Sequence, residues 1–289
     1  MDYSRIRLIG LDLDGTAFTT DKRITPETQS AIADAIAAGI DVIPASGRPL
    51  NGMPREFVEI PGVRYILGSN GAFVWDMKEK RFAVHSLIPT PTVLKAYDLF
   101  TACDCDFEVY VDGRPYTAAD KISRADYYFP DPYIRAYALK TRVRVDDLRD
   151  FLSRQEGAEK LNISFPAQEE KKKGLEIAAR LPELAAASGI PTNIEMTRGD
   201  VNKGEGLMRL AAALGLKREN VMAVGDHGND IPMIRMAGVG VAMANALFTV
   251  KAEADVILPW TNDEEGAAKL LRRAAADRKA AGPASGGEV

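Results

Sequence analysis

The sequence has little cysteine and no long apolar run, and each absence excludes a class of protein. Its only cysteines, Cys103 and Cys105, are two residues apart. They are poorly placed to bridge each other and too few for a zinc site. Free thiols are typical of a reducing compartment, so we expect a cytoplasmic protein. No apolar stretch approaches the ~18 residues of a membrane-spanning helix, and the N-terminus lacks the pattern of a signal peptide.

The chain also lacks an excess of positive charge. Lysine and arginine together number 37 against 41 aspartates and glutamates, a formal net charge of −4. This balance, with no dominant basic patch, argues against nucleic acid and against an anionic membrane surface as partners. An acidic protein that binds an anionic substrate needs local positive charge or a metal. The 289 residues are 46% apolar, enough for the core of one large domain or two modest ones.

Apolar strands alternate with amphipathic helices at both ends of the chain. Residues 7–13 are almost continuously apolar, as in a strand buried on both faces. Thr25 can cap a helix that ends at Gly39. Further strands are expected at 40–45, 64–67, 221–224, 239–243 and 255–258, and further helices at 203–214 and 231–236. This order predicts an α/β fold, a Rossmann-like parallel sheet with helices on both faces.

The middle of the chain has a different pattern of expected strands and helices. Asp112-Gly113 separates two strand-like runs and predicts a hairpin. Residues 161–165 alternate like a half-exposed strand, and helices are expected at 92–100, 146–155 and 172–184. We therefore expect an inserted α+β cap domain at 86–194 within a discontinuous core domain of residues 1–85 and 195–289. The tail from about Ala274 is expected to be frayed or disordered.

The first chemical motif is Asp12-Leu13-Asp14-Gly15-Thr16, at the end of the first strand. Ligands of parallel sheets bind at the carboxyl ends of strands. Two carboxylates this close are costly unless a cation or a proton compensates them. A hard cation with oxygen ligands, Mg²⁺ above all, is the natural solution. A plain turn after a strand is the alternative for this motif taken alone.

Three further motifs also follow a strand or begin a helix. Ser46-Gly47-Arg48 follows the second strand and offers a hydroxyl and backbone N–H groups to phosphate oxygens, although Ser-Gly is a common turn. Lys203 begins a helix, where it opposes the helix dipole, although most lysines are simply solvated. Asp226, Asn229 and Asp230 follow a third buried strand. Asp230 also suits a helix cap, and His227 is expected near the rim of the site and not as a base.

Taken together, these motifs resemble those of the haloacid dehalogenase-like superfamily, and within it the Cof-type phosphatases with an inserted C2-type cap. Asp12 to Thr16 matches the first motif, Ser46 the second, Lys203 the third, and Gly225 to Asp230 the fourth. The resemblance covers roughly residues 6–85 and 195–270. The turns Asn70-Gly71-Ala72 and Asn245-Ala246 also match the family, whereas Ala17-Phe18 stands where the family often has leucine.

The resemblance implies a Mg²⁺-dependent phosphatase that acts on small phosphate monoesters through an aspartyl-phosphate. Asp12 would be the nucleophile, and Asp14 would protonate the leaving alkoxide and then activate water. The metal would be held by Asp12, the Asp14 carbonyl and Asp226, with Asp230 acting directly or through water.

The remaining site residues would act on the phosphate and the substrate. Ser46 and Lys203 would hold phosphate oxygens, and Lys203 would also screen the nucleophile. Gly47 and Arg48 flank the phosphate, and Asn229 would contact the substrate or orient the residues around it. The cap would close over the site as a lid.

Two alternatives stay open. A phosphomutase of the same superfamily would use the same four motifs but return the phosphoryl group to its substrate. A non-catalytic regulator that binds sugar phosphates would keep the fold without turnover. The partner expected in each case is a small phosphorylated metabolite.

Overall fold

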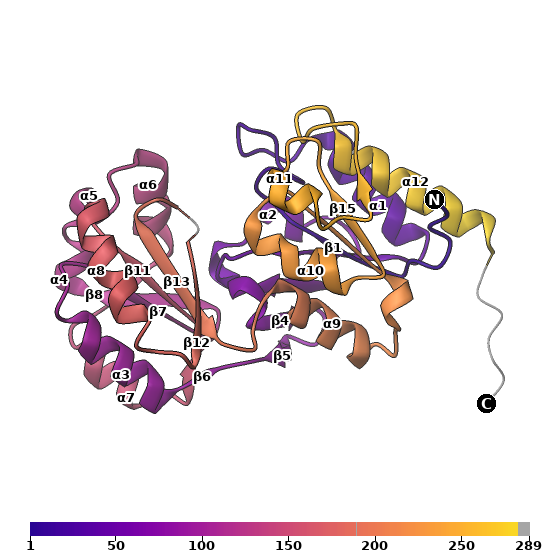
Figure 1. The fold of residues 1–289 in the computed structure, drawn as a ribbon. Helices are drawn as coiled ribbons and strands as arrows, with labels where there is room; N and C mark the ends of the chain where they lie inside the picture. Colours follow the sequence, from indigo (N-terminus) through magenta and orange to yellow (C-terminus); the bar gives the residue numbers. More distant parts are fainter. Residues whose placement is uncertain (189, 283–289) are drawn as a thin grey trace.

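A parallel β-sheet, ordered β16-β15-β14-β1-β2, forms the centre of the larger body of the protein (Figure 1). The computed structural model describes residues 1–188 and 190–282. The strands of this sheet are β1 (Leu8–Leu11), β2 (Asp41–Pro44), β14 (Val221–Gly225), β15 (Val239–Ala242) and β16 (Val256–Ile257). β1 pairs in parallel with β14 on one side and with β2 on the other. The two ends of the chain therefore meet at β1.

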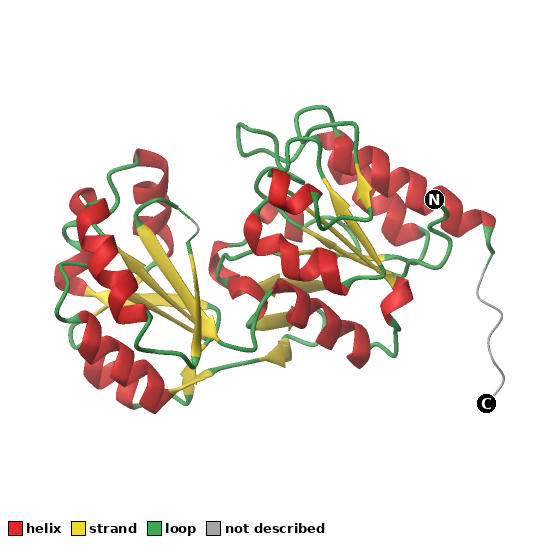
Figure 2. Cartoon of the chain, viewed as in Figure 1, coloured by secondary structure: helices red, strands yellow, loops and turns green. Residues whose placement is uncertain are grey.

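Helices cover both faces of this sheet (Figure 2). Along β1, Ile9 and Leu11 pack in the cluster that holds α1 and α12, whereas Leu8 packs in the cluster that holds α9 and α10. This alternation confirms the predicted α/β fold with a doubly covered sheet. The α-helices of this body are α1 (Pro26–Ala37), α2 (Arg55–Val58), α9 (Lys203–Ala213), α10 (Ile231–Met236), α11 (Phe248–Lys251) and α12 (Gly266–Ala280). Its 3₁₀ turns are η1 (Leu50–Gly52), η2 (Ser69–Gly71), η3 (Arg218–Asn220) and η4 (Gly228–Asp230).

The strand expected at 64–67 forms, but it pairs in a sheet that the sequence did not predict. An antiparallel sheet contains β3 (Tyr65–Gly68), β4 (Phe73–Asp76) and β5 (Arg81–His85). The turn η2 between β3 and β4 has positive φ angles at Ser69 (47°) and Asn70 (56°). The N–H of Asn70 donates to the carbonyl of Ser46 at 3.1 Å. This turn therefore supports the segment that follows β2.

The second body is built on a mainly antiparallel sheet, ordered β12-β13-β11-β7-β8-β9. Its strands are β7 (Asp106–Val111), β8 (Arg114–Ala118), β9 (Val143–Val145), β11 (Lys160–Ser164), β12 (Leu184–Ala187) and β13 (Asn193–Arg198). Asp112 (φ 48°) and Gly113 (φ 73°) join β7 to β8. Two positive φ angles are what a tight type I′ hairpin requires, so the predicted hairpin is confirmed.

Helices of the second body form two groups. The helices α3 (Thr90–Phe100), α7 (Leu148–Ser153) and α8 (Gln168–Ala178) pack on one face of the sheet. A smaller cluster holds α4 (Ala119–Ile122), α5 (Ala125–Tyr128) and α6 (Pro132–Thr141). A separate short pair joins β6 (Ile88–Pro89) to β10 (Gly157–Ala158).

Strand β11 differs from its prediction, because all five of its residues are buried. Leu161 and Ile163 pack in the apolar cluster with α3 and α8. Lys160, Asn162 and Ser164 line a cavity between the two bodies. The apolar residues of the alternating pattern therefore face the interior of the second body. Its polar residues face a buried cavity and not solvent.

We propose that the two bodies are separate domains and call them the core and the cap. The chain enters the cap after β5 and leaves it after β13 (Figure 1). The sequence placed the insertion at 86–194, but β13 pairs within the cap sheet as far as Arg198. Helix α9 begins at Lys203, so we propose that the return to the core lies within 199–202.

The C-terminal helix extends further than the sequence suggested. Ala274 and Ala275 are buried in α12, which packs along α1. The expectation of a frayed chain from Ala274 is therefore wrong as far as Ala280, and residues 283–289 lie outside the described part. Cys103 and Cys105 are free, as predicted, and both are buried. Among the described residues, no helix has both the length and the apolar character needed to cross a membrane.

Candidate active site

Residues from all four motifs surround one cavity of about 720 Å³ between the core and the cap. β1 ends next to Asp12 and β14 next to Asp226, while Ser46 lies two residues beyond β2 and Lys203 opens α9. These elements bring their side chains together because the carboxyl ends of parallel strands share one edge of the sheet. The predicted site residues that line the cavity are Asp12, Asp14, Ser46, Gly47, Arg48, Lys203, Asp226 and Asn229. Asp230 is fully buried behind them.

Lys203 lies between two buried carboxylates. Its Nζ is 2.6 Å from Oδ1 of Asp12 and 2.7 Å from Oδ1 of Asp230. Only 1% of Lys203 is exposed. Burial alone would lower the pKa of the Lys203 ammonium, but the two carboxylates outweigh burial and raise it. Lys203 is therefore a fixed positive charge beside Asp12.

Asp12 is crowded by like charge. Burial raises the pKa of the Asp12 carboxyl well above its usual value, and repulsion from Asp230 adds to the effect, while Lys203 opposes it. Burial and the charge of Asp230 also raise the pKa of Asp226, to about 6. One ammonium thus faces three acidic side chains. Further positive charge at this place would relieve the repulsion.

Asp230 has a different environment from the other two acids. Its Oδ2 accepts hydrogen bonds from the backbone N–H groups of Asp226 and His227, both at 3.0 Å. Its Oδ1 is bound by Lys203. Both oxygens therefore have partners, and Asp230 holds the loop after β14 as well as the lysine.

Three carboxylates could hold a metal ion together. One oxygen each from Asp12, Asp226 and Asp230 lies within 4.8 Å of the others. The surplus of negative charge and the all-oxygen donor set fit a hard divalent cation. Asp226 also accepts a hydrogen bond from the Thr16 hydroxyl at 3.1 Å. A Cβ on Gly15 (φ 86°) would lie 2.4 Å from Oδ2 of Asp226, so glycine is required there for two reasons.

The carboxylate of Asp14 pairs with two cations. Lys22 contacts its carboxylate at 2.9 Å and Arg48 at 3.1 Å. Burial opposes ionisation of Asp14, but Arg48 and then Lys22 hold its pKa below the usual value. Lys22 was not predicted as a site residue, because it belongs to no motif; it precedes α1 in a loop and has a positive φ of 60°.

The turn after β2 is held from several sides. Ser46 is 4% exposed, and its Oγ accepts from the N–H of Arg48 at 3.3 Å. A Cβ on Gly47 would lie 2.8 Å from Oδ1 of Asn70, so the turn and η2 approach closely at this point. Asn229 and His227 are exposed at the mouth of the cavity. The expected rim position of His227 is therefore observed.

The cap wall of the cavity was largely missed by the sequence. It contains Tyr110, Tyr137, Lys160 and Glu195, which come from four separate elements of the cap. Tyr137 of α6 lies 5.5 Å from Arg48, measured from the guanidinium carbon to the ring centroid. Lys160 of β11 lines the cavity, whereas Arg114 and Tyr116 of β8 do not. The alternating polar residues of β11 were the feature of the sequence that could have indicated this wall.

Comparisons with known proteins show the family of this chain. A family model described as haloacid dehalogenase-like hydrolase matches residues 9–271. The chain is 33% identical over 268 residues to 5-amino-6-(5-phospho-D-ribitylamino)uracil phosphatase YcsE of Bacillus subtilis, covering 92% of this chain and 95% of that protein. It is 26% identical over 262 residues to pyridoxal phosphate phosphatase YbhA of Escherichia coli, covering 87% and 93%. A solved haloacid dehalogenase-like hydrolase of B. subtilis matches with a TM-score of 0.77 at 26% identity, covering 92% and 99%.

Proposed function

From the premise that this chain belongs to the haloacid dehalogenase-like hydrolase family, we propose that it is a Mg²⁺-dependent phosphatase whose nucleophile is Asp12. Its relatives are phosphatases of this family, and the chain is a phosphoric monoester hydrolase. The observation that carries the assignment of Asp12 is its contact with Lys203 at 2.6 Å, beside Asp226 in the shared cavity. A buried carboxylate held by a fixed cation is suited to attack on a negatively charged phosphoryl group.

The reaction we propose has two steps. A carboxylate oxygen of Asp12 attacks phosphorus, the bond from phosphorus to the ester oxygen breaks, and Asp14 gives a proton to the leaving oxygen. Asp14 then takes a proton from water, which attacks phosphorus and breaks the bond to Asp12. Inorganic phosphate leaves, and both carboxyl groups return to their starting states. Arg48 and Lys22 stabilise ionised Asp14, so we propose that substrate draws Arg48 away and that Asp14 takes up a proton from solvent before the first step.

The residues that bind phosphate oxygens are proposed from their positions around the cavity. Lys203 supplies a full positive charge, Ser46 a hydroxyl, and the turn at Gly47 backbone N–H groups. Arg48 lies where it can contact the substrate between the core and the cap. Asn229 can contact the substrate at the mouth of the cavity.

The family uses a divalent metal, and the acidic cluster of this chain fits one. We propose Mg²⁺, held by Asp12, Asp226 and the backbone carbonyl of Asp14. Asp230 acts indirectly, because Lys203 and two backbone N–H groups already bind its oxygens. When bound there, such an ion would supply positive charge to the phosphate oxygens.

We propose an uncharged, polar leaving group. The charged residues of the cap wall already have partners: Lys160 pairs with Glu195 at 3.0 Å, and Arg142 pairs with Glu108 at 2.5 Å. A second phosphate on the substrate would have to break one of these buried pairs. The volume of about 720 Å³ accommodates a sugar, a polyol or a heterocycle. Relatives named for phosphates of a ribitylaminouracil and of pyridoxal support a screen across these classes.

The test of the function is release of inorganic phosphate from p-nitrophenyl phosphate and from a panel of metabolite phosphates. We expect turnover with Mg²⁺ and none in EDTA. Asp12→Asn should abolish turnover and leave the protein folded by circular dichroism. Substantial activity in that variant would rule out Asp12 as nucleophile. A pure, folded protein without activity on the whole panel would favour the regulator alternative.

The phosphomutase alternative makes a different prediction. A mutase needs a sugar bisphosphate activator and releases little inorganic phosphate, whereas the proposed enzyme releases it from a single substrate. The paired charges of the cap wall favour the phosphatase. A cytoplasmic location is also proposed, on the basis of the free thiols of Cys103 and Cys105.

A further inference from the structure

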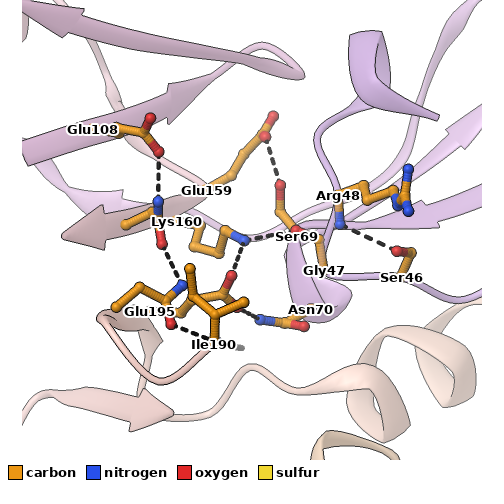
Figure 3. A network of polar contacts seen from close by, with 12 residues as sticks. Ser46, Gly47, Arg48, Ser69, Asn70, Glu108, Glu159, Lys160, Ile190 and Glu195 are labelled. Carbon is orange, nitrogen blue, oxygen red and sulfur yellow. Dashed lines mark hydrogen bonds and ion pairs between the residues drawn. The ribbon is translucent and has the colours of Figure 1, made fainter. Parts of the chain in front are cut away.

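Lys160 of the cap contacts the core turn that follows β2. Its Nζ donates to the carbonyl oxygen of Gly47 at 2.6 Å and to Oε1 of Glu195 at 3.0 Å (Figure 3). The same ammonium lies 4.5 Å from the ring centroid of Tyr110. Lys160 is only 1% exposed. A buried ammonium is costly unless its donors are used, so these contacts define a specific site for this side chain.

The carbonyl of Gly47 sets the direction of the next backbone N–H. The described residues contain no cis peptide bond, and in a planar trans peptide the C=O and the following N–H point in opposite directions. Lys160 holds the Gly47 carbonyl toward the cap. The N–H of Arg48 accordingly points to the other side, where it meets Oγ of Ser46 at 3.3 Å. A contact from the cap thus fixes a donor of the turn we assign to phosphate binding.

Glu195 joins Lys160 to the neighbouring core turn η2. While its Oε1 binds Lys160, its Oε2 accepts from Nδ2 of Asn70 at 2.6 Å. Asn70 has a φ of 56°, which is uncommon for a residue other than glycine. Its Oδ1 crowds Gly47 and has no hydrogen-bond partner among the described residues. The ion pair of Lys160 and Glu195 in the cap therefore contacts both core turns.

We propose that Lys160 is a positioning residue for phosphate binding, because it orients the Gly47–Arg48 peptide when the cap rests on the core. This inference rests on the proposed phosphatase function. If Lys160 has this role, the phosphate site is complete only when the cap rests on the core. Moving the cap away would withdraw Lys160 and leave this peptide free to rotate.

The competing explanation is that Lys160 binds the leaving group. Inorganic phosphate separates the two roles, since it has no leaving group. Lys160→Met keeps the aliphatic stem and removes the ammonium. If Lys160 positions the turn, the Kd of inorganic phosphate, measured by titration calorimetry with Mg²⁺, should rise about tenfold, the usual scale for losing a charged hydrogen bond. The KM for p-nitrophenyl phosphate should rise by a similar factor.

Two further variants keep the result interpretable. Glu195→Gln removes the anion that holds Lys160 and should weaken phosphate binding by a smaller factor in the same direction. Lys95→Met removes an exposed cap lysine that pairs with Glu183 and should leave the Kd unchanged. Thermal unfolding of each variant is recorded alongside. If Lys160→Met does not fold, Glu195→Gln decides the question by the same measurement.

The proposal is overturned if Lys160→Met folds and binds inorganic phosphate as the wild type does, even if its KM for larger substrates rises. An unchanged Kd in Glu195→Gln, where only that variant folds, has the same meaning. If the proposed function is wrong, a different result is expected: the wild-type protein hydrolyses no phosphate monoester. In that case the effect of Lys160 on phosphate affinity is still measured by calorimetry.

Discussion

The Nζ of Lys203 lies 2.6 Å from Oδ1 of Asp12, although 191 residues separate them in the chain. The parallel sheet makes this contact possible, because β1 and β14 are neighbours and α9 begins beside their carboxyl ends. Asp230 binds the same ammonium from the other side. The site therefore depends on a buried charge that three distant segments share.

Lys203→Met should remove activity and also destabilise the protein. The change leaves Asp12 and Asp230 buried without a cation, and breaking a buried pair costs roughly 3–5 kcal/mol. We expect kcat to fall by roughly 100-fold or more, as for other lost electrostatic contacts to a transition state. Phosphate release and urea unfolding measure the two effects. Lys173→Met, at an exposed ion pair with Glu170, should change neither. Near-normal turnover in the Lys203 variant would contradict its assigned role.

Metal removal should lower the melting temperature of the wild-type protein. A cation that binds only the folded state stabilises it by about 2.7 kcal/mol at a concentration 100 times its Kd. Because the pKa of Asp226 is raised to about 6, protons compete with the metal as the pH falls through that value. The shift in melting temperature between Mg²⁺ and EDTA should therefore be larger at pH 7.5 than at pH 5.

Asp226→Asn is the matched test of this site. It should abolish the response to Mg²⁺, while Asp200→Asn, at an acidic residue bound by Arg198 and Arg209, should retain it. A wild-type protein whose melting temperature ignores Mg²⁺ at pH 7.5 would argue against the metal site. A response that survives in Asp226→Asn would argue against this ligand.

Both the parallel sheet and the proximity of the four motifs could be predicted from the sequence, and one rule of sheet geometry explains why. Residues at the carboxyl ends of buried strands, such as Asp12 and Asp226, must lie at a common edge once the sheet is parallel. Strongly patterned elements were also recognised, and the helix predicted at 231–236 matches α10. These features depend on local pattern and on a general rule of sheet geometry.

The cap wall could not be predicted in this way. Lys160, Tyr137 and Glu195 reach the site only because the cap rests on the core, and no local pattern encodes that contact. Helix α6, which carries Tyr137, is only weakly amphipathic. The alternation in β11 predicted a solvent face, whereas that face meets the cavity. Polar residues at a buried interface and at an exposed surface look alike in a sequence.

Gly15→Ala should impair metal binding more than its backbone strain explains. A Cβ at residue 15 would lie 2.4 Å from Oδ2 of Asp226 and displace that carboxylate. Gly39→Ala is a close control, because Gly39 has φ 82° against 86° for Gly15 but nothing within 4 Å of its Cβ. Both changes should cost roughly 1–2 kcal/mol of stability for the left-handed backbone. Only Gly15→Ala should also weaken Mg²⁺ binding and reduce turnover. Equal activity in the two variants would contradict the proposed position of Asp226 in the metal site.

A buried carboxyl in the cap should make the stability of that domain depend on pH. Asp106 is fully buried on β7, where burial and then repulsion from Glu108 raise its pKa to about 7. Its Oδ1 accepts from the Thr117 hydroxyl, and its Oδ2 has no partner among the described residues. In the unfolded chain an aspartate releases its proton near pH 3.8. The folded state thus binds the proton more tightly, and stability should be lost as the pH rises from about 4 to about 7.

Asp106→Asn should remove this dependence. The amide resembles the protonated acid, so stability at pH 4 should change little, whereas at pH 8 the variant should be more stable by on the order of 4 kcal/mol. Both tryptophans, Trp75 and Trp260, lie in the core, so urea unfolding of the cap is best followed by far-ultraviolet circular dichroism. Asp98→Asn, at an exposed pair with Arg149, should leave the slope between pH 5 and pH 8 unchanged. A variant at Asp106 that is no more stable than the wild type at pH 8 would show that the folded cap accommodates the ionised carboxylate.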